Sequence, residues 1–164
     1  MSEPLDPAVF RQAMGRVVHG VSVLTTVAGG HDHAMTADTV TSVSLEPLLV
    51  LCCAETEARY HDAVLESGVW GVSVLAADQR AASEWFATRG RPLHGQLDRT
   101  PFHRGEKTGV ALLDGALMHL EVRTTDVHPA GDHSIIVGEV LSIALPDTVG
   151  SALVHYRGRY GGLA

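Results

Sequence analysis

The sequence has little positive charge and no long uninterrupted apolar run. Its 164 residues include 12 Lys and Arg against 19 Asp and Glu, which gives a formal net charge of -7 and a pI near 5.7. This acidic balance argues against nucleic acid or an anionic membrane as the main partner. No apolar stretch approaches the length of a membrane span, and the first ten residues lack the basic and apolar regions of a signal peptide.

Cysteine is also scarce. The two cysteines, Cys52 and Cys53, are neighbours, so in a strand their side chains point to opposite faces and cannot form a disulfide that staples the fold. Within their apolar run both are expected to be small packing residues rather than a redox pair. The length suits one domain with a real core and is short for two. We therefore predict a single domain over residues 1–164, located in the reducing cytoplasm.

Several catalytic motifs are missing. The chain has no GxGxxG after its first predicted strand, no GxxxxGK[ST] and no GxSxG, which excludes a Rossmann fold, a P-loop and a serine nucleophile elbow. Among ten histidines, His31 and His33 share a Gly-rich loop, but no HExxH motif or paired CxxC motif accompanies them. No metal site is predicted.

The hydrophobic pattern predicts a mainly antiparallel β-barrel decorated with a few short helices. Helices are expected from Asp6-Pro7 to about Val18, from Ala58 to Glu66, and from Asp78 to about Ala87. Strands are expected at Val21–Val27, Thr36–Leu45, Leu48–Ala54, Val69–Leu75, Ala116–Val127 and His133–Leu145. A hairpin loop is expected at Gly29–His33, an irregular connector and candidate lid at Thr88–Gly109, and a glycine-loosened tail at Ala152–Leu163.

The stretch from Ala34 to Ala54 is rich in small hydroxylated residues. They are Thr36, Thr39, Thr41, Ser42 and Ser44. Short side chains leave room against the backbone, and hydroxyls with exposed amides suit a phosphate or the polar edge of a planar ring. The alternative is an ordinary edge strand in which Thr serves β-propensity alone. The residues by themselves leave both interpretations open.

Two other positions are candidate ligand contacts. His133 follows Gly131-Asp132 at a turn and begins a strand that is otherwise apolar, so it either faces a ligand or simply bonds to Asp132. Tyr160 lies between glycines in the tail, where it either stacks on a planar ring or covers the barrel end as ordinary core.

A series of short motifs runs through nearly the whole chain, from about Phe10 to Leu163. In order they are FRxxMG at 10–15, GVxVLTT at 20–26, MTADT at 35–39, SVSLEP at 42–47, SG at 67–68, VxVL at 72–75, GDH at 131–133, VGEV at 137–140 and YRGxY at 156–160. In this order and spacing they resemble the flavin reductase-like family. Its members are the short-chain NAD(P)H:flavin oxidoreductases that serve two-component flavin monooxygenases.

The resemblance implies a split β-barrel of the FMN-binding type that forms a homodimer, with flavin near the subunit interface. It assigns the isoalloxazine ring and ribityl chain to Thr36, Ala37, Asp38, Thr39, Ser42, Val43 and Ser44. It places Cys53, Ala54, Ala58 and Arg59 by the phosphate, where a guanidinium suits that anion. His133, the candidate catalytic residue, and Tyr160 are placed near the flavin and the incoming nicotinamide.

The resemblance further implies the chemistry. FMN or FAD is the flavin, NADH or NADPH donates the hydride, and a flavin-dependent monooxygenase receives the reduced flavin. Hydride passes from nicotinamide C4 to flavin N5, which requires no side-chain base. Two alternatives stay open: a split barrel that binds flavin tightly and reduces another acceptor, and a non-catalytic flavin carrier.

Three positions depart from the family pattern. Asp38 stands where the family usually has an amide, Val40 where it often has Phe, and Leu48 where a second Pro is common. An ionised Asp38 facing the ring repels an electron-rich flavin edge, so there it must be protonated or bonded to a donor. These departures bear on flavin preference and affinity rather than on the fold.

Overall fold

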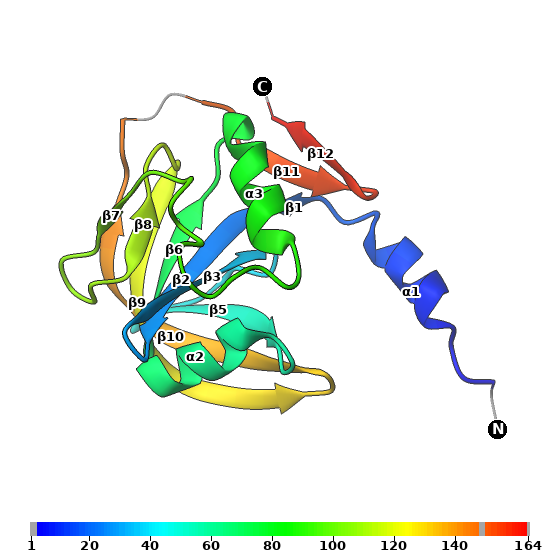
Figure 1. Cartoon of the computed structure of the whole chain (residues 1–164). Helices are drawn as coiled ribbons and strands as arrows, with labels where there is room; N and C mark the ends of the chain where they lie inside the picture. Colours follow the sequence, from blue (N-terminus) through cyan, green and yellow to red (C-terminus); the bar gives the residue numbers. More distant parts are fainter. Residues whose placement is uncertain (1–2, 148–149, 164) are drawn as a thin grey trace.

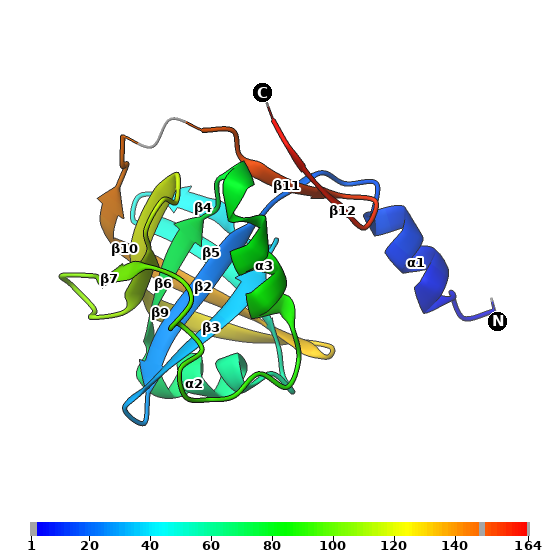
Figure 2. The same ribbon diagram turned by 45° about the horizontal axis from the view of Figure 1, so that its top comes forward.

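A seven-stranded antiparallel sheet forms the body of the molecule and curls into a barrel (Figures 1 and 2). The computed structural model describes residues 3–147 and 150–163. The strand order is β3-β2-β6-β9-β10-β5-β4. The strands are β2 (Ser22–Ala28), β3 (His31–Ala37), β4 (Thr41–Leu45), β5 (Leu48–Glu55), β6 (Val69–Val74), β9 (Met118–Ala130) and β10 (His133–Ala144). The prediction of a mainly β fold with short helices is confirmed.

Smaller elements surround the barrel. The helices are α1 (Pro7–Met14), α2 (Arg59–Ser67) and α3 (Arg80–Ala87), the last preceded by the 3-10 turn η1 (Ala77–Gln79). Strands β1 (His19–Gly20), β11 (Leu153–Tyr156) and β12 (Arg159–Gly162) make a small sheet, and β7 (Phe102–Arg104) pairs with β8 (Ala111–Leu113). Helix α2 covers one end of the barrel, α3 lies beside β3, and α1 projects away from the body (Figures 1 and 2).

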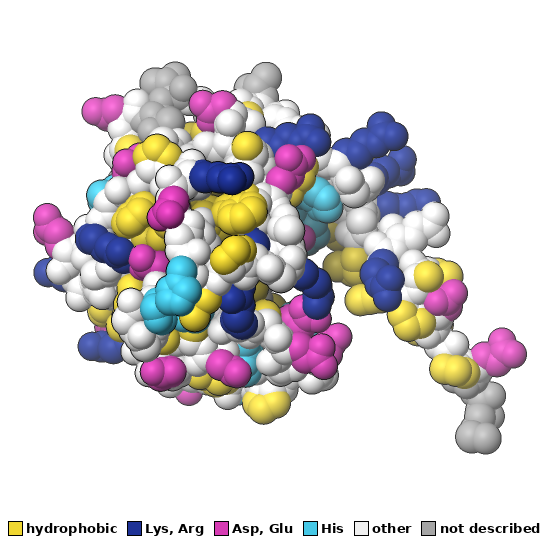
Figure 3. Space-filling view, viewed as in Figure 1, with side chains coloured by type: hydrophobic (Ala, Val, Ile, Leu, Met, Phe, Trp, Pro, Cys, Tyr) yellow, Lys and Arg dark blue, Asp and Glu magenta, His cyan; other side chains and the backbone are white. Residues whose placement is uncertain are grey.

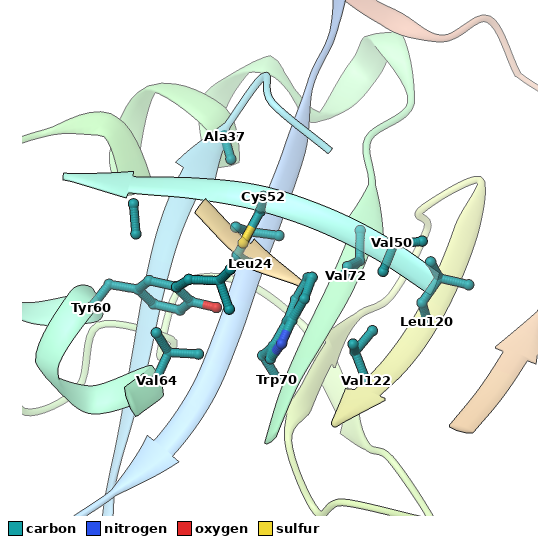
Figure 4. Packing of buried hydrophobic residues seen from close by; sticks show 12 residues of the cluster. Leu24, Ala37, Val50, Cys52, Tyr60, Val64, Trp70, Val72, Leu120 and Val122 are labelled. Carbon is teal, nitrogen blue, oxygen red and sulfur yellow. The ribbon is translucent and has the colours of Figure 1, made fainter. Parts of the chain in front are cut away.

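The main core fills the barrel. Leu24, Trp70 and Val122 reach it from three strands, while Tyr60 and Val64 close it from α2 (Figure 4). Cys52 points into the same core, and burial raises the pKa of its thiol to about 12. Its thiol therefore stays protonated at neutral pH and acts as a small apolar side chain, as the sequence predicts.

A second core lies outside β2. Because alternate side chains of a strand face opposite sides, Leu24 points into the barrel while Val21 and Val23 point outward. The outward pair packs against Phe86 of α3 and Leu113 of β8. Strand β2 is thereby buried on both faces, which fixes α3 and the β7–β8 hairpin against the barrel wall.

The predicted single strand Thr36–Leu45 is wrong. Strand β3 begins earlier, at His31, because Gly29 and Gly30 alone make the hairpin turn with φ of 58° and 76°, the geometry of a tight two-residue turn. The strand ends at Ala37, and residues 38–40 then carry the chain across to β4. Three residues span only about 10 Å, so the two edge strands of the sheet are held near each other.

Three other predicted boundaries differ. The first helix ends at Met14 instead of Val18, because the amides of Arg16 and Val17 bond three residues back in a tight turn. The expected loose tail is the β11–β12 hairpin, whose turn residues Arg157 and Gly158 have φ of 50° and 74°. The expected irregular connector contains β7. Strands of three or four residues are too short to give a hydrophobic period.

Glycine is required at position 71, where β6 passes beneath the β7–β8 hairpin. A Cβ there would lie 2.7 Å from Thr25 Oγ1 and 2.8 Å from Val110 Cγ2. Gly71→Ala is therefore expected to lower the free energy of unfolding by about 1–3 kcal/mol through overpacking. Urea titration measures this. Gly20→Ala is the control, since its Cβ would meet no described atom within 4 Å; equal losses in the two variants would contradict the packing argument.

Candidate functional site

A cavity of about 520 Å³ lies in the slot between β3 and the second half of β5. Strand β4 pairs only with Leu48–Leu51 of β5, so the rest of β5 faces the edge of β3 across this slot. The lining consists of residues 33–39, 53, 55, 57–60, 86–91, 96 and 133. A volume of this size is typical of sites for small molecules and cofactors.

The β3 wall offers backbone groups more than hydroxyls. As an edge strand, β3 pairs with β2 alone among the described strands and leaves its other edge toward the slot. The Thr36 hydroxyl donates to the carbonyl of Ser83 at 2.6 Å, and the Thr39 hydroxyl oxygen accepts the Cys53 amide at 3.0 Å. Both hydroxyls therefore already make a hydrogen bond within the protein. Two carbonyls of β3 are also taken, that of Ala34 by Arg91 and that of Asp32 by Gln96. The remaining part of the strand edge is the hydrogen-bonding surface left for the rim of a planar ligand.

The start of α2 forms an anion-attracting end. The helix begins at Arg59 after Ala58, which provides no side-chain cap. Uncapped first-turn amides and the helix dipole together favour a negative group. Arg59, Arg89 and Arg91 bring three guanidinium groups to the same lining. This end of the cavity has the donor set that a phosphate needs.

Arg91 fixes the wall formed by the segment after α3. Its guanidinium donates to three backbone carbonyls, those of Ala34, Phe86 and Thr88. Burial, together with the nearby Arg59 charge, lowers the pKa of Arg91. Trp85 Nε1 donates to the Gln96 carbonyl at 2.8 Å and fastens the segment a second time. This part of the predicted lid is tied to β3 and α3.

His133 lies on the cavity lining at the start of β10. Its Nδ1 shares a hydrogen bond of 2.7 Å with the Asp132 carboxylate, and this bond lowers the pKa of Asp132. The bond of the ring to Asp132 through Nδ1 is the second of the two alternatives raised by the sequence, and it leaves Nε2 without a described partner. A ligand contact of His133 stays a prediction. A neighbouring carboxylate that orients an imidazole in this way leaves the other nitrogen directed and available.

Eight of the predicted site residues line this cavity. They are Thr36, Ala37, Asp38, Thr39, Cys53, Ala58, Arg59 and His133. Asp38 is exposed and also lines a second cavity, of about 520 Å³, which includes Ser42 and lies at the barrel end opposite α2. The carboxylate at position 38 therefore stands at the junction of the two cavities.

The other four predicted residues lie elsewhere. Val43 is exposed at the β4 bulge, and the Ser44 hydroxyl accepts the Glu46 amide at 3.2 Å. Ala54 is fully buried in the barrel core. Tyr160 lines neither cavity, and its hydroxyl lies 2.8 Å from Ser83 Oγ.

Sequence reasoning missed part of the lining. His33, Glu55, Arg89, Arg91 and Gln96 all face the cavity. Burial lowers the pKa of His33, which keeps this imidazole neutral at pH 7. Arg89 and Arg91 were assigned only to a connector, and their charge within a Gly- and Pro-rich stretch was the one available signal.

The described residues carry neither a membrane-spanning helix nor a cluster of metal ligands. No described helix is both long and apolar enough to cross a membrane. Within residues 3–147 and 150–163, no group of three or more His, Cys, Asp or Glu side chains is arranged to hold a metal ion.

Comparison with known proteins identifies the family. The model of the flavin reductase-like domain matches residues 14–164. This chain belongs to the flavin reductase-like family. An NADH-dependent flavin reductase from Rhodococcus sp is 40% identical over 166 residues, which cover 97% of this chain and 90% of the relative. The predicted family is confirmed.

Two further relatives place flavin reduction in two-component systems. HsaB, the reductase subunit of a flavin-dependent monooxygenase from Rhodococcus jostii, is 32% identical over 99% of this chain and 80% of its own. The structure of BorF, the flavin reductase component of a bacterial two-component tryptophan halogenase, superimposes with a TM-score of 0.91 at 42% identity, covering 96% of this chain and 98% of BorF. The predicted split-barrel fold is confirmed. The homodimer stays a prediction.

Proposed function

We propose that this chain is an NADH-dependent flavin reductase that supplies reduced flavin to a separate flavin-dependent monooxygenase. The observation that carries the proposal is one cavity with an anion-attracting helix start, an open strand edge and an oriented His133. The family match and the names of the relatives agree with it. Those names also favour NADH over NADPH as the hydride donor.

The cavity fits a flavin. Its α2 end can bind a phosphate through first-turn amides and Arg59, and the part of the β3 edge not bonded to Arg91 or Gln96 can bond to the polar rim of a planar ring. Met35 and Ala37 add apolar surface to the same wall. When bound, the flavin supplies the redox chemistry by accepting a hydride from the nicotinamide. The residues of this chain hold and orient the two rings, and they transfer no proton themselves.

His133 positions the nicotinamide in this scheme. Its Nδ1 is engaged by Asp132, so Nε2 is the nitrogen that can meet a polar group of the incoming ligand. His133→Ala is expected to raise the KM for NADH about tenfold, the loss typical of one hydrogen bond to a ligand. His128→Ala, an exposed substitution outside the cavity, is the control.

The assay for this function is anaerobic bleaching of excess FMN by NADH at catalytic protein concentration. The wild type is expected to turn over, and His133→Ala to need more NADH. No bleaching with any pairing of NADH or NADPH with FMN or FAD would refute the reductase. Unchanged NADH kinetics in His133→Ala would remove only His133 from its role. Yellow colour that survives gel filtration would indicate tightly held flavin.

Asp38 is expected to limit flavin affinity. Its exposed carboxylate stands beside the slot where the ring would lie, and like charge near an electron-rich edge costs about 1 kcal/mol at 4 Å in water. Asp38→Asn is therefore expected to lower the Kd for FMN about fivefold, as measured by flavin fluorescence titration. Asp126→Asn, an exposed change on β9, is the control. Equal Kd values for Asp38→Asn and wild type would show that this carboxylate does not face the ring.

The homodimer is the second part of the proposal. None of the α1 residues is buried, although Val9, Phe10 and Met14 are apolar. Figure 3 shows apolar side chains, in yellow, on the segment that projects from the body. A helix of eight residues is not stable alone in water, so α1 requires a surface to pack against. Further apolar side chains are exposed on the barrel strands and just after β10, at Val43, Leu45, Leu48, Ile143 and Leu145. A second copy of the chain supplies matching surfaces for both.

Phe10→Glu is expected to convert this dimer to monomer. The Phe10 side chain is 63% exposed, and a charge at the centre of an apolar contact is costly to bury. Size-exclusion chromatography with light scattering measures the mass. Leu65→Glu, on the exposed face of α2, is the matched control. A monomeric wild type at micromolar concentration would refute the dimer and leave the reductase assay unaffected.

A further inference from the structure

Of the three guanidinium groups at the phosphate end of the cavity, one is free to change partners. Arg91 is held by the three backbone carbonyls named above. Arg59 extends from the start of α2 and contacts the Arg91 carbonyl. Arg89 differs from both, because it bonds to no backbone group in the described chain and pairs only with the carboxylate of Glu55.

The Arg89–Glu55 contact leaves most of the guanidinium unused. One nitrogen, Nη2, donates to both Glu55 oxygens at 3.0 and 2.8 Å. Within residues 3–147 and 150–163, Nε and Nη1 of Arg89 have no hydrogen-bond partner, and the side chain is 80% exposed. Ion pairs between exposed side chains add little to stability. A ligand with more negative charge than a carboxylate can therefore take Arg89 from Glu55.

The position of the Arg89–Glu55 pair in the chain indicates which anionic ligand could take Arg89 from Glu55. Glu55 is the last residue of β5, and the turn after it leads directly to Ala58 and Arg59 at the start of α2. That helix start is the proposed site of the flavin phosphate. FMN ends at this phosphate, whereas FAD continues through a shared oxygen to a second one. Arg89 is the cation of the same lining that has no backbone partner in the described chain, and an anionic carboxylate already lies against it.

We propose that Arg89 recognises the second phosphate of FAD, and that Glu55 competes for the same guanidinium and so sets the preference between FAD and FMN. This rests on the proposed function of the cavity. Binding FAD breaks the Arg89–Glu55 pair and replaces it with a charge-assisted bond to phosphate. Binding FMN leaves the pair in place. Glu55 is thus a specificity-determining residue although it carries the same charge as the ligand.

Opposite substitutions at the pair are expected to have opposite effects. Arg89→Gln removes the phosphate contact and is expected to raise the ratio of the Kd for FAD to the Kd for FMN about tenfold. Glu55→Gln removes the competitor and is expected to lower the same ratio about threefold. A pair with a purely structural role would give changes of the same sign, because either variant breaks the same ion pair.

The test is fluorescence titration of FAD and of FMN, without nicotinamide and at one ionic strength. Arg123→Gln and Glu139→Gln are matched controls, since Arg123 and Glu139 form a similarly exposed ion pair across β9 and β10, away from the cavity. The ratio is expected to stay at the wild-type value in both. NADH kinetics with FMN are measured on the same variants.

Several results would overturn the proposal. A ratio unchanged in Arg89→Gln, or a ratio that moves in the same direction in Arg89→Gln and Glu55→Gln, removes Arg89 from FAD recognition. A higher KM for NADH with FMN in Arg89→Gln assigns this guanidinium to the diphosphate of the nicotinamide cofactor instead. If one of these results is found and the wild-type protein still reduces FMN, the role of Arg89 in FAD recognition is refuted and the proposed function stands. A wild type that binds neither flavin overturns both.

Discussion

The three-residue connection at 38–40 is the constraint on which the architecture depends. It joins the two edge strands of the sheet, β3 and β4, and is too short to let them separate. The sheet must therefore curl until its edges meet, which closes the main core around Leu24 and Trp70. The closure is incomplete, because β4 stops pairing at Leu51 and leaves the slot beside β3. The same connection thus makes both the barrel and its cavity.

Outside the barrel, polar contacts position the far wall of the cavity. Segment 88–91 has no regular structure, and Arg91 holds it by replacing the hydrogen bonds that a strand would have made with bonds to carbonyls of β3 and α3. A half-buried guanidinium with several acceptors is costly to remove. In segment 88–91, Arg91 is therefore fixed by its hydrogen bonds, whereas the exposed side chain of Arg89 can change partners.

The sequence predicted local features well and long-range ones poorly. The predicted end of α2, Glu66, is within one residue of the observed end, Ser67, because glycine follows there and a helix end is a matter of local chemistry. Gly68 adopts the positive φ of 72° that ends the helix. The place of Arg91 on the cavity lining was not predicted, because its guanidinium bonds to Ala34, 57 residues away in the chain. Ala54 shows an error that strand periodicity could have prevented: in β5 its side chain shares the inward face with Cys52, while Cys53 faces the cavity.

Ser83 joins three elements that are distant in the sequence. Its carbonyl accepts the Thr36 hydroxyl on the cavity wall, and its own hydroxyl bonds to that of Tyr160 in the C-terminal hairpin. The serine itself is fully buried in α3. The hairpin is thereby connected to β3 through two hydrogen bonds of a single residue. The C-terminal hairpin and the cavity wall therefore meet at one buried residue, although Tyr160 is 77 residues and Thr36 is 47 residues from Ser83 in the sequence.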